Sequence, residues 1–299
     1  MPRSTSSFRI VRVLLIVSGL FVVLSPAIRG QSTNLSSKVN GTLPNGSLFR
    51  GSAAEITQSN MQGLITVQPK SGPFKAAQTG VLKLGLGSTN RDGYLYVPPQ
   101  YDSSKASSFI LAIHAAGKSG MDALQLLYSS AASSGIMVLA PDSRGATWDD
   151  LPAAQGSFGP DIAFINAALA QTFALYNVDA TKLGIQGFSD GATYALGLGM
   201  IDGQLFRKVM ANSPGGILAD SSQGQPPIFI SAGLQDNIFP IQQAGNADTC
   251  YLKQLGYRVT YVQFNGGHEV PANIVSDTIQ WFQGSYPQTN SIPSGVCSR

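Results

Sequence analysis

One five-residue stretch, Gly187-Phe188-Ser189-Asp190-Gly191, has the residue types and the spacing of a catalytic nucleophile. Residues 181–187 before it have the pattern of a short buried strand, and residues 191–200 after it that of a helix of small side chains. A serine on a sharp turn between strand and helix presents its hydroxyl clear of the backbone, and the flanking glycines remove Cβ atoms that would clash there. The pattern predicts a nucleophile elbow with Ser189 as the nucleophile.

A serine hydroxyl needs a neighbouring base, and the base needs an acid that orients it. Of the two histidines, His268 lies in a loop between the last expected strand and the last expected helix, and Asp236 directly follows the expected strand 228–231. We predict that Ser189, Asp236 and His268 act together as nucleophile, acid and base. Taken alone, Asp236 would fit a turn or helix-capping acid equally well, and His268 a surface loop histidine.

Two other aspartates are weaker candidates for the acid. Asp248 falls inside an expected helix, and Asp220 lies in a polar loop before a strand. Neither therefore follows the end of a strand, where Asp236 lies.

The tetrahedral oxyanion that forms when a serine attacks a carbonyl group needs preorganised N–H donors. We expect one from the backbone of Asp190, which follows the nucleophile, and the other from the loop 114–120. In that loop Ala116 is the first choice and Ala115 the second. His114 closes an apolar strand, and we interpret it as a structural residue that orients this loop.

Trp148 has two readings that the sequence leaves open. It would line the acyl pocket, together with Ala115, or pack over a loop. No cluster of His, Cys, Asp and Glu has the spacing of metal ligands, so no metal is expected.

Strands and helices alternate along most of the chain, which predicts a mostly parallel sheet with helices on both faces. An antiparallel hairpin of residues 81–86 and 93–97 would form one edge. The other expected strands are 109–114, 136–140, 183–186, 208–211, 228–231 and 258–264, and the expected helices are 120–134, 158–176, 191–200, 242–255 and 272–282. In such sheets ligands bind beyond the carboxyl ends of the strands, where Ser189, Asp236 and His268 are expected.

The first thirty residues have the layout of a secretory signal peptide, with arginines before a 12-residue apolar run and small residues after it. An uncleaved anchor is the alternative, but the run is short of the ~20 residues that a spanning helix needs. The expected organisation is a signal peptide (1–30), a Ser/Asn-rich linker and lead-in (31–78), a catalytic domain (79–284) and a C-terminal tail (285–299), in a protein that is secreted.

The basic character of the chain belongs to this leader. The formal charge is +3, and residues 1–30 contain four arginines and no acid, so their removal leaves 15 basic and 16 acidic residues. No basic run remains that would favour a nucleic-acid partner. With 43% hydrophobic and 12% charged residues, the rest suits a compact globular protein.

Two further features fit an extracellular protein. The two cysteines, Cys250 and Cys297, predict one disulfide that tethers the tail, with two unpaired thiols as the alternative. Three sequons, at Asn34, Asn40 and Asn45, follow the leader and predict glycosylation if the source is eukaryotic.

The chain resembles the α/β-hydrolase superfamily, specifically the phospholipase/carboxylesterase group and its polyhydroxybutyrate-depolymerase-like and feruloyl-esterase-like relatives. The blocks that carry the resemblance are HAAGKSG (His114–Gly120), APDSRGATWD (Ala140–Asp149), FGPDIAFI (Phe158–Ile165), GFSDGATYALGLG (Gly187–Gly199), GLQDNIFP (Gly233–Pro240) and FNGGHEVP (Phe264–Pro271). Their order, Ser then Asp then His, is that of the superfamily. Ala115 and Asp190 depart from the pattern, since relatives often have glycine and glutamine there.

This resemblance implies a serine carboxylesterase that needs no cofactor and acts on a small-molecule or polymeric ester. A lysophospholipase or polyester depolymerase is the alternative among enzymes. From another class, the chain would be an inactive hydrolase fold used for binding, which an intact set of Ser189, Asp236 and His268 disfavours.

Overall fold

The structure is a computed structural model, and it describes residues 62–74, 78–87, 90–151, 156–219, 221–287 and 292–297. The expected signal peptide, the three sequons at Asn34, Asn40 and Asn45, and the first part of the expected linker lie outside these residues. Within the described ranges, none of the helices has the length and apolar character that crossing a bilayer requires.

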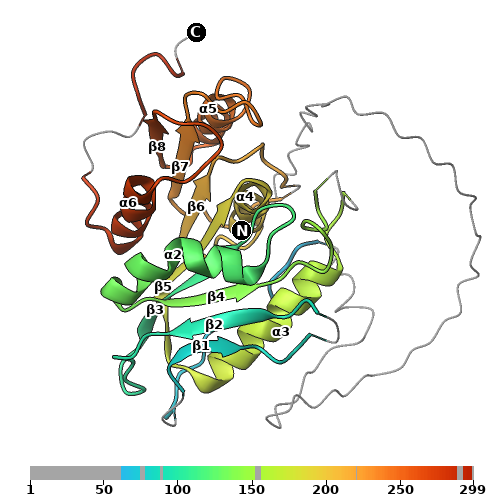
Figure 1. Cartoon of the computed structure of the whole chain (residues 1–299), viewed down its shortest axis with the longest axis vertical. Helices are drawn as coiled ribbons and strands as arrows, with labels where there is room; N and C mark the ends of the chain where they lie inside the picture. The colour runs from blue at the N-terminus through green and yellow to red at the C-terminus, as the bar shows by residue number, and fades with distance from the viewer. Residues whose placement is uncertain are drawn as a thin grey trace, which may run out of the picture.

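The centre of the molecule is an eight-stranded sheet in the order β1-β2-β4-β3-β5-β6-β7-β8 (Figure 1). β1 and β2 form an antiparallel hairpin at one edge, β2 also pairs antiparallel with β4, and every pair from β4 to β8 is parallel. The mostly parallel sheet with an antiparallel edge is therefore confirmed. The strands are β1 (Gly80–Lys83), β2 (Gly93–Val97), β3 (Ser107–Ile113), β4 (Met137–Pro141), β5 (Val178–Phe188), β6 (Lys208–Asn212), β7 (Ile228–Gly233) and β8 (Val259–Phe264).

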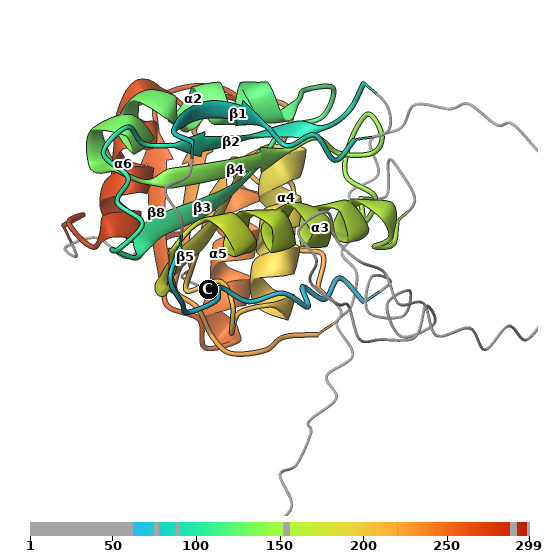
Figure 2. The same cartoon turned by 90° about the horizontal axis from the view of Figure 1, so that it is seen from below.

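Helices cover both faces of the sheet, as Figure 2 shows. α2 (Gly120–Ser134) and α6 (Ala272–Gln283) pack on one face, and α3 (Pro160–Leu175), α4 (Asp190–Ile201) and α5 (Gly245–Gln254) on the other. One apolar core lies between the sheet and each helical layer. β3 and β4 contribute side chains to both cores, so these strands are buried on both sides.

Part of the expected lead-in packs against the helices. The Ile65 side chain is buried, and its backbone N–H donates to Asp202 Oδ1 over 3.0 Å. The Thr66 N–H donates to Asn166 Oδ1 over 2.9 Å. Burial raises the pKa of Asp202 to about 7. Residues around 65 are thus held by buried polar groups of the helical layer.

The topology brings the expected site together. Ser189 follows β5, Asp236 lies three residues after β7, and His268 lies four residues after β8. β5, β6, β7 and β8 are parallel neighbours, so their carboxyl ends meet at one edge of the sheet. This is the edge at which open α/β sheets bind their ligands.

Candidate active site

The turn at Ser189 is a strained backbone conformation that two glycines permit. Ser189 has φ 60° and ψ −126°, a region that L-residues rarely adopt. A Cβ at position 187 would run into the Gly191 carbonyl, and a Cβ at position 191 would run into the Ile113 carbonyl. The Ser189 N–H donates to the Asn212 carbonyl over 3.0 Å, which fixes the turn against the neighbouring strand. The elbow geometry thus depends on glycine at both flanks.

Ser189, His268 and Asp236 form a continuous hydrogen-bonded chain. Ser189 Oγ lies 2.7 Å from His268 Nε2, and His268 Nδ1 lies 2.7 Å from Asp236 Oδ2. These distances are within the range that proton transfer from a serine to an oriented histidine requires. The Asp236 side chain is 1% exposed and the His268 side chain 15%, so the chain of contacts is largely shielded from water.

Both oxygens of the Asp236 carboxylate have defined partners. Oδ1 accepts the backbone N–H groups of Ile238 and Phe239 over 2.9 and 2.8 Å, which leaves Oδ2 directed at His268. Rings flank the imidazole: Phe188 and Phe239 lie 5.1 and 5.2 Å from His268, centroid to centroid. The acid and the base therefore have little freedom to turn away from Ser189.

The loops that carry the acid and the base are joined by main-chain hydrogen bonds. The N–H of Leu234 donates to the Phe264 carbonyl, and that of Gln235 donates to the Gly266 carbonyl, each over 2.9 Å. A Cβ at Gly233 would run into the Gly267 carbonyl, so these backbones approach too closely for any other residue. The separation of Asp236 and His268 is consequently set by backbone contacts.

The two expected oxyanion donors lie in suitable local structures. Asp190 is the first residue of α4, where backbone N–H groups lack intrahelical acceptors. Ala116 lies in an exposed turn closed by the Lys118 N–H to Ala115 carbonyl bond of 3.1 Å. Neither the Asp190 nor the Ala116 N–H donates a hydrogen bond within the described part of the chain. Both donors are thus free for a ligand, and their role in an oxyanion hole stays a prediction.

His114 holds the loop that carries Ala116. Its ring is 2% exposed, its Nε2 accepts the Ser143 N–H over 2.9 Å, and its Nδ1 lies 2.7 Å from the Ala115 carbonyl oxygen. Since Nε2 is an acceptor, Nδ1 carries the proton and donates to that carbonyl. Burial lowers the pKa of His114, which favours this neutral form. The contacts match the structural role that we expect for this residue.

Trp148 packs beneath the same loop instead of lining a pocket. It has no exposed surface, its Nε1 donates to the His114 carbonyl over 2.8 Å, and its ring stacks on Tyr194 at 4.9 Å. The structure therefore agrees with the second reading of this tryptophan and corrects the first. Ala115, which is partly exposed, is the remaining pocket candidate from the sequence.

The side chain of Asp190 has a partner that the sequence did not reveal. Its Oδ2 accepts the Thr147 hydroxyl over 2.7 Å, and next to Thr147 the Ala146 carbonyl accepts the Gly117 N–H over 2.7 Å. The elbow, the segment around Thr147 and the loop of Ala116 are thus connected in series.

A buried pair of carboxylates fixes the segment that contains Thr147. The Asp161 N–H donates to Asp149 Oδ2 and the Asp149 N–H to Asp161 Oδ2, each over 2.8 Å, and the Tyr194 hydroxyl donates to Asp149 Oδ1 over 3.2 Å. Burial and the neighbouring charge of Asp149 raise the pKa of Asp161 to about 6. The only sequence signal for this pair is Pro160-Asp161, which is typical of a helix start.

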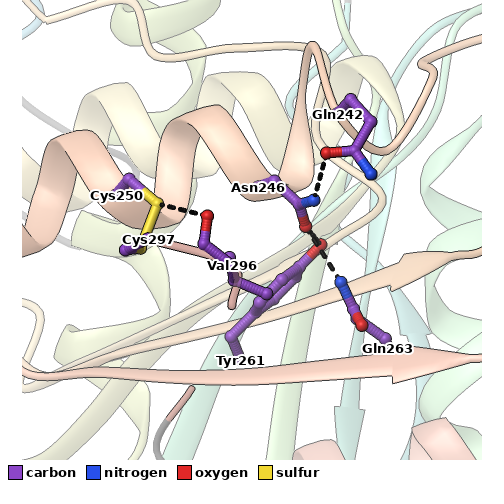
Figure 3. Close-up of a disulfide and its surroundings, with 7 residues drawn as sticks. All are labelled: Gln242, Asn246, Cys250, Tyr261, Gln263, Val296 and Cys297. Carbon is purple, nitrogen blue, oxygen red and sulfur yellow. Dashed lines mark hydrogen bonds between the residues drawn. A yellow bond between two sulfur atoms is a disulfide. The ribbon is translucent and has the colours of Figure 1, made fainter. Parts of the chain in front are cut away.

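The Cys250–Cys297 disulfide is present, with 5.5 Å between the two Cα atoms (Figure 3). It ties residues 292–297 to α5, and Cys250 Sγ lies 3.4 Å from the Val296 carbonyl oxygen.

Two residues before Cys250, Asp248 is buried inside α5, and burial raises its pKa to about 8. Asp248 is therefore mostly protonated at neutral pH and is no substitute for Asp236. Within the described residues, no three His, Cys, Asp or Glu side chains gather as metal ligands would.

Comparisons with known proteins find relatives that are named feruloyl esterases. No family model matches the chain. It is 26% identical over 178 residues to the probable feruloyl esterase C of Aspergillus clavatus, which covers 56% of this chain and 61% of that protein. It is 28% identical over 167 residues to feruloyl esterase C of Emericella nidulans, covering 52% and 59%. The chain thus spans about three fifths of the length of these relatives.

Solved structures share the fold. Esterase PE8 has a TM-score of 0.52 and 19% identity, covering 64% of this chain and 97% of that one. Esterase 2 of Thermogutta terrifontis, solved after phosphorylation by paraoxon, has a TM-score of 0.54 and 19% identity, covering 67% and 90%. With the sheet order, these likenesses confirm the α/β-hydrolase fold that the sequence predicts.

Proposed function

We propose that this chain of α/β-hydrolase fold is a secreted serine carboxylesterase that cleaves esters through an acyl-enzyme intermediate. The observation that carries the proposal is the chain of two 2.7 Å contacts from Ser189 through His268 to Asp236. Curated relatives that are named feruloyl esterases support the reaction class and suggest an ester with an aromatic acyl group. The expected leader and the Cys250–Cys297 disulfide support secretion.

In the acylation half, Ser189 Oγ attacks the ester carbonyl carbon while its proton moves to His268 Nε2. The carbonyl oxygen becomes an oxyanion, which the backbone N–H groups of Asp190 and Ala116 stabilise. Collapse of the tetrahedral intermediate breaks the bond to the alcohol oxygen, and that oxygen takes the proton from Nε2. Asp236 stays ionised and keeps the imidazole in the required orientation.

In the deacylation half, water takes the place of the alcohol. Its oxygen attacks the acyl carbon, one of its protons passes to His268 Nε2, and a second tetrahedral intermediate forms. When this intermediate collapses, Ser189 Oγ leaves and recovers the proton, and the carboxylic acid is released. No cofactor takes part in any of these steps.

Two alternatives are enzymes that would share this chemistry, and a third is a binding protein that would lack it. A lysophospholipase or a polyester depolymerase would use the same three residues on another ester, so only substrate tests separate them. An inactive binding protein of this fold would not need Ser189, His268 and Asp236 within hydrogen-bond distance, and their contacts disfavour it.

The test compares Ser189→Ala with Ser213→Ala. Ser213 also follows a strand and has a positive φ of 50°, but its Oγ lies 3.4 Å from the Glu269 carbonyl oxygen, which is not a base. We expect hydrolysis of p-nitrophenyl esters to fall by about 10³-fold or more in Ser189→Ala and to persist in Ser213→Ala. A fluorophosphonate probe should label the wild type and Ser213→Ala only. Labelling of Ser189→Ala, or a tenth of wild-type kcat in it, would refute the assignment.

A panel of esters then tests the substrate. Feruloyl esters, p-nitrophenyl esters of increasing chain length, hydroxybutyrate oligomers and lysophospholipids are compared by kcat/KM, since this ratio measures discrimination between substrates. A clear preference for feruloyl esters supports the suggestion from the relatives. Preference for a lysophospholipid or a hydroxybutyrate oligomer would transfer the chain to the alternative enzyme class.

A further inference from the structure

A pocket with a basic lining lies at the end of the sheet that is opposite to Ser189. It has a volume of about 460 Å³ and is lined by residues at or near the amino ends of β6, β7 and β8, by the last turns of α5 and α6, and by Ile292. Ser189, in contrast, follows the carboxyl end of β5. The sheet separates the two places by about 20 Å, the length of a six-residue strand.

Three cationic side chains line this pocket, and no acidic residue of the described chain does. They are Lys208 of β6, Lys253 of α5 and Arg258, which directly precedes β8. Two of the three have a structural task. Lys208 Nζ donates to the carbonyl oxygens of Trp281 and Phe282 at the end of α6, over 2.8 and 3.0 Å. Lys253 lies in the last turn of α5, where a cation offsets the helix dipole.

Arg258 has no such task. Its side chain is exposed, and within the described part of the chain its guanidinium makes neither a hydrogen bond nor an ion pair. Burial, and after it the positive charge of Arg258, lowers the pKa of Lys208. The arginine therefore repels its neighbour in the free protein, and a bound anion would remove that repulsion.

One side of the pocket is formed by a segment that a disulfide ties to the rest of the fold. Ile292 belongs to the C-terminal segment, which the Cys250–Cys297 disulfide ties to α5 (Figure 3). Val296 of the same segment packs against the apolar core. A wall that is already fixed lowers the ordering cost of binding, because less chain must be immobilised when a ligand enters.

We propose that this pocket binds a small anion that carries two or more carboxylate or phosphate groups. The planar fork of Arg258 would hold one of these groups through two hydrogen bonds, and Lys253 and Lys208 would supply charge for the other. Val259 and Ile292 give apolar contact for the body of the molecule. The volume lies within the range of small-molecule sites.

The experiment titrates the full chain with citrate and with pyrophosphate by calorimetry, at an ionic strength fixed with sodium chloride. We expect submillimolar binding of at least one probe, and Arg258→Gln should weaken it by about tenfold or more. Lys253→Gln, as a second variant, should weaken it as well. The matched control is Arg207→Gln: Arg207 is exposed next to Lys208, donates to the Ala180 carbonyl over 3.2 Å and does not line the pocket.

The outcomes separate a built site from a general positive field. Loss in Arg258→Gln with unchanged affinity in Arg207→Gln supports the site, and the preferred probe tells carboxylate from phosphate. Equal losses in the two arginine variants, or no binding of either probe to the wild type, would overturn the proposal. Neither result bears on the hydrolysis of esters at Ser189, which is measured separately.

Discussion

Replacement of Asp236 by asparagine tests how the site orients its base. Oδ1 of Asp236 accepts two backbone N–H groups, from Ile238 and Phe239. The carbonyl oxygen of an asparagine must take this position, because an amide NH₂ there would face two donors. The NH₂ group then takes the position of Oδ2, which lies 2.7 Å from His268 Nδ1, and directs an N–H at this nitrogen.

The consequence is the wrong tautomer of His268. With an N–H donor in front of it, Nδ1 must act as an acceptor, so the proton of the neutral ring moves to Nε2. Nε2–H can no longer accept the proton of Ser189 Oγ. For a base held in the wrong tautomer the expected loss in kcat is about 10⁴-fold, or ~5 kcal/mol of transition-state stabilisation; the asparagine variant of the chymotrypsin-type triad is the source of this magnitude.

The assay is kcat/KM and kcat for a p-nitrophenyl ester, together with thermal unfolding to show that the variant folds. Asp248→Asn serves as the control, since it makes the same replacement at a buried aspartate of α5 that has no contact with His268. We expect the control to keep wild-type kcat. A loss of less than about tenfold in Asp236→Asn would refute the tautomer argument, because the wrong tautomer leaves no base at all.

Three other predictions follow from the same contacts. His268→Ala should cost nearly as much kcat as loss of the nucleophile, whereas His114→Ala should mainly lower the melting temperature; exchanged phenotypes in ester hydrolysis and thermal unfolding would contradict both assignments. Reduction of Cys250–Cys297, whose cysteines are 47 residues apart, should destabilise the fold by ~4 kcal/mol and lower Tm by about 10 °C, while most activity at room temperature remains. Non-reducing mass spectrometry checks that the bond is present, and thermal scans with and without reductant measure the change in Tm. The pKa of Asp248 is raised to about 8 in the folded state, so its ionisation opposes folding increasingly from about pH 4 to pH 8. Between about pH 5 and pH 8, the free energy of unfolding of Asp248→Asn, measured in urea, should therefore rise by ~4 kcal/mol relative to that of the wild type. A difference between the two proteins that does not change with pH would contradict this.

The sequence predicts the sheet well where its strands are buried on both faces. Residues 109–114 and 136–140 are continuous apolar runs, and β3 and β4 lie within one or two residues of them. β5 begins at Val178, earlier than predicted, and its first residues include the exposed polar side chains of Thr181 and Lys182. An exposed strand start has no apolar pattern by which it could be recognised.

The start of α5 is another difference, as is the end of β1, which stops at Lys83 instead of residue 86. Helical spacing predicts a helix from 242, but α5 begins at Gly245. The N–H groups of Gln243 and Ala244 both donate to the Pro240 carbonyl, so this stretch is a separate turn. Pro240 thus starts a turn before the helix, and element boundaries of this kind depend on local hydrogen bonds that periodicity does not record.

The sequence singles out Ser189, Asp236 and His268 because each follows the end of an expected strand, Ser189 lies in a G-x-S-x-G pattern and the chain has only two histidines. Their supports could not be singled out in this way. Thr147 and Asp190, or Asp149 and Asp161, are ordinary polar residues, and the sequence does not show that they meet. Each pairing depends on the path of the segment that follows β4, which only the folded chain defines.

The support of the Ala116 loop explains why buried aspartates lie close to a site whose proposed chemistry does not involve their carboxylates. The loop of Ala116 is exposed, so it cannot gain rigidity from an apolar core of its own. It gains rigidity from hydrogen bonds to Ala146 and Trp148, and the segment of these two residues is fixed in turn by the carboxylates of Asp190 and Asp149. Free N–H donors stabilise an oxyanion only if they are already in place when the charge forms. The desolvation that raises the pKa of Asp149 is the cost of holding them there.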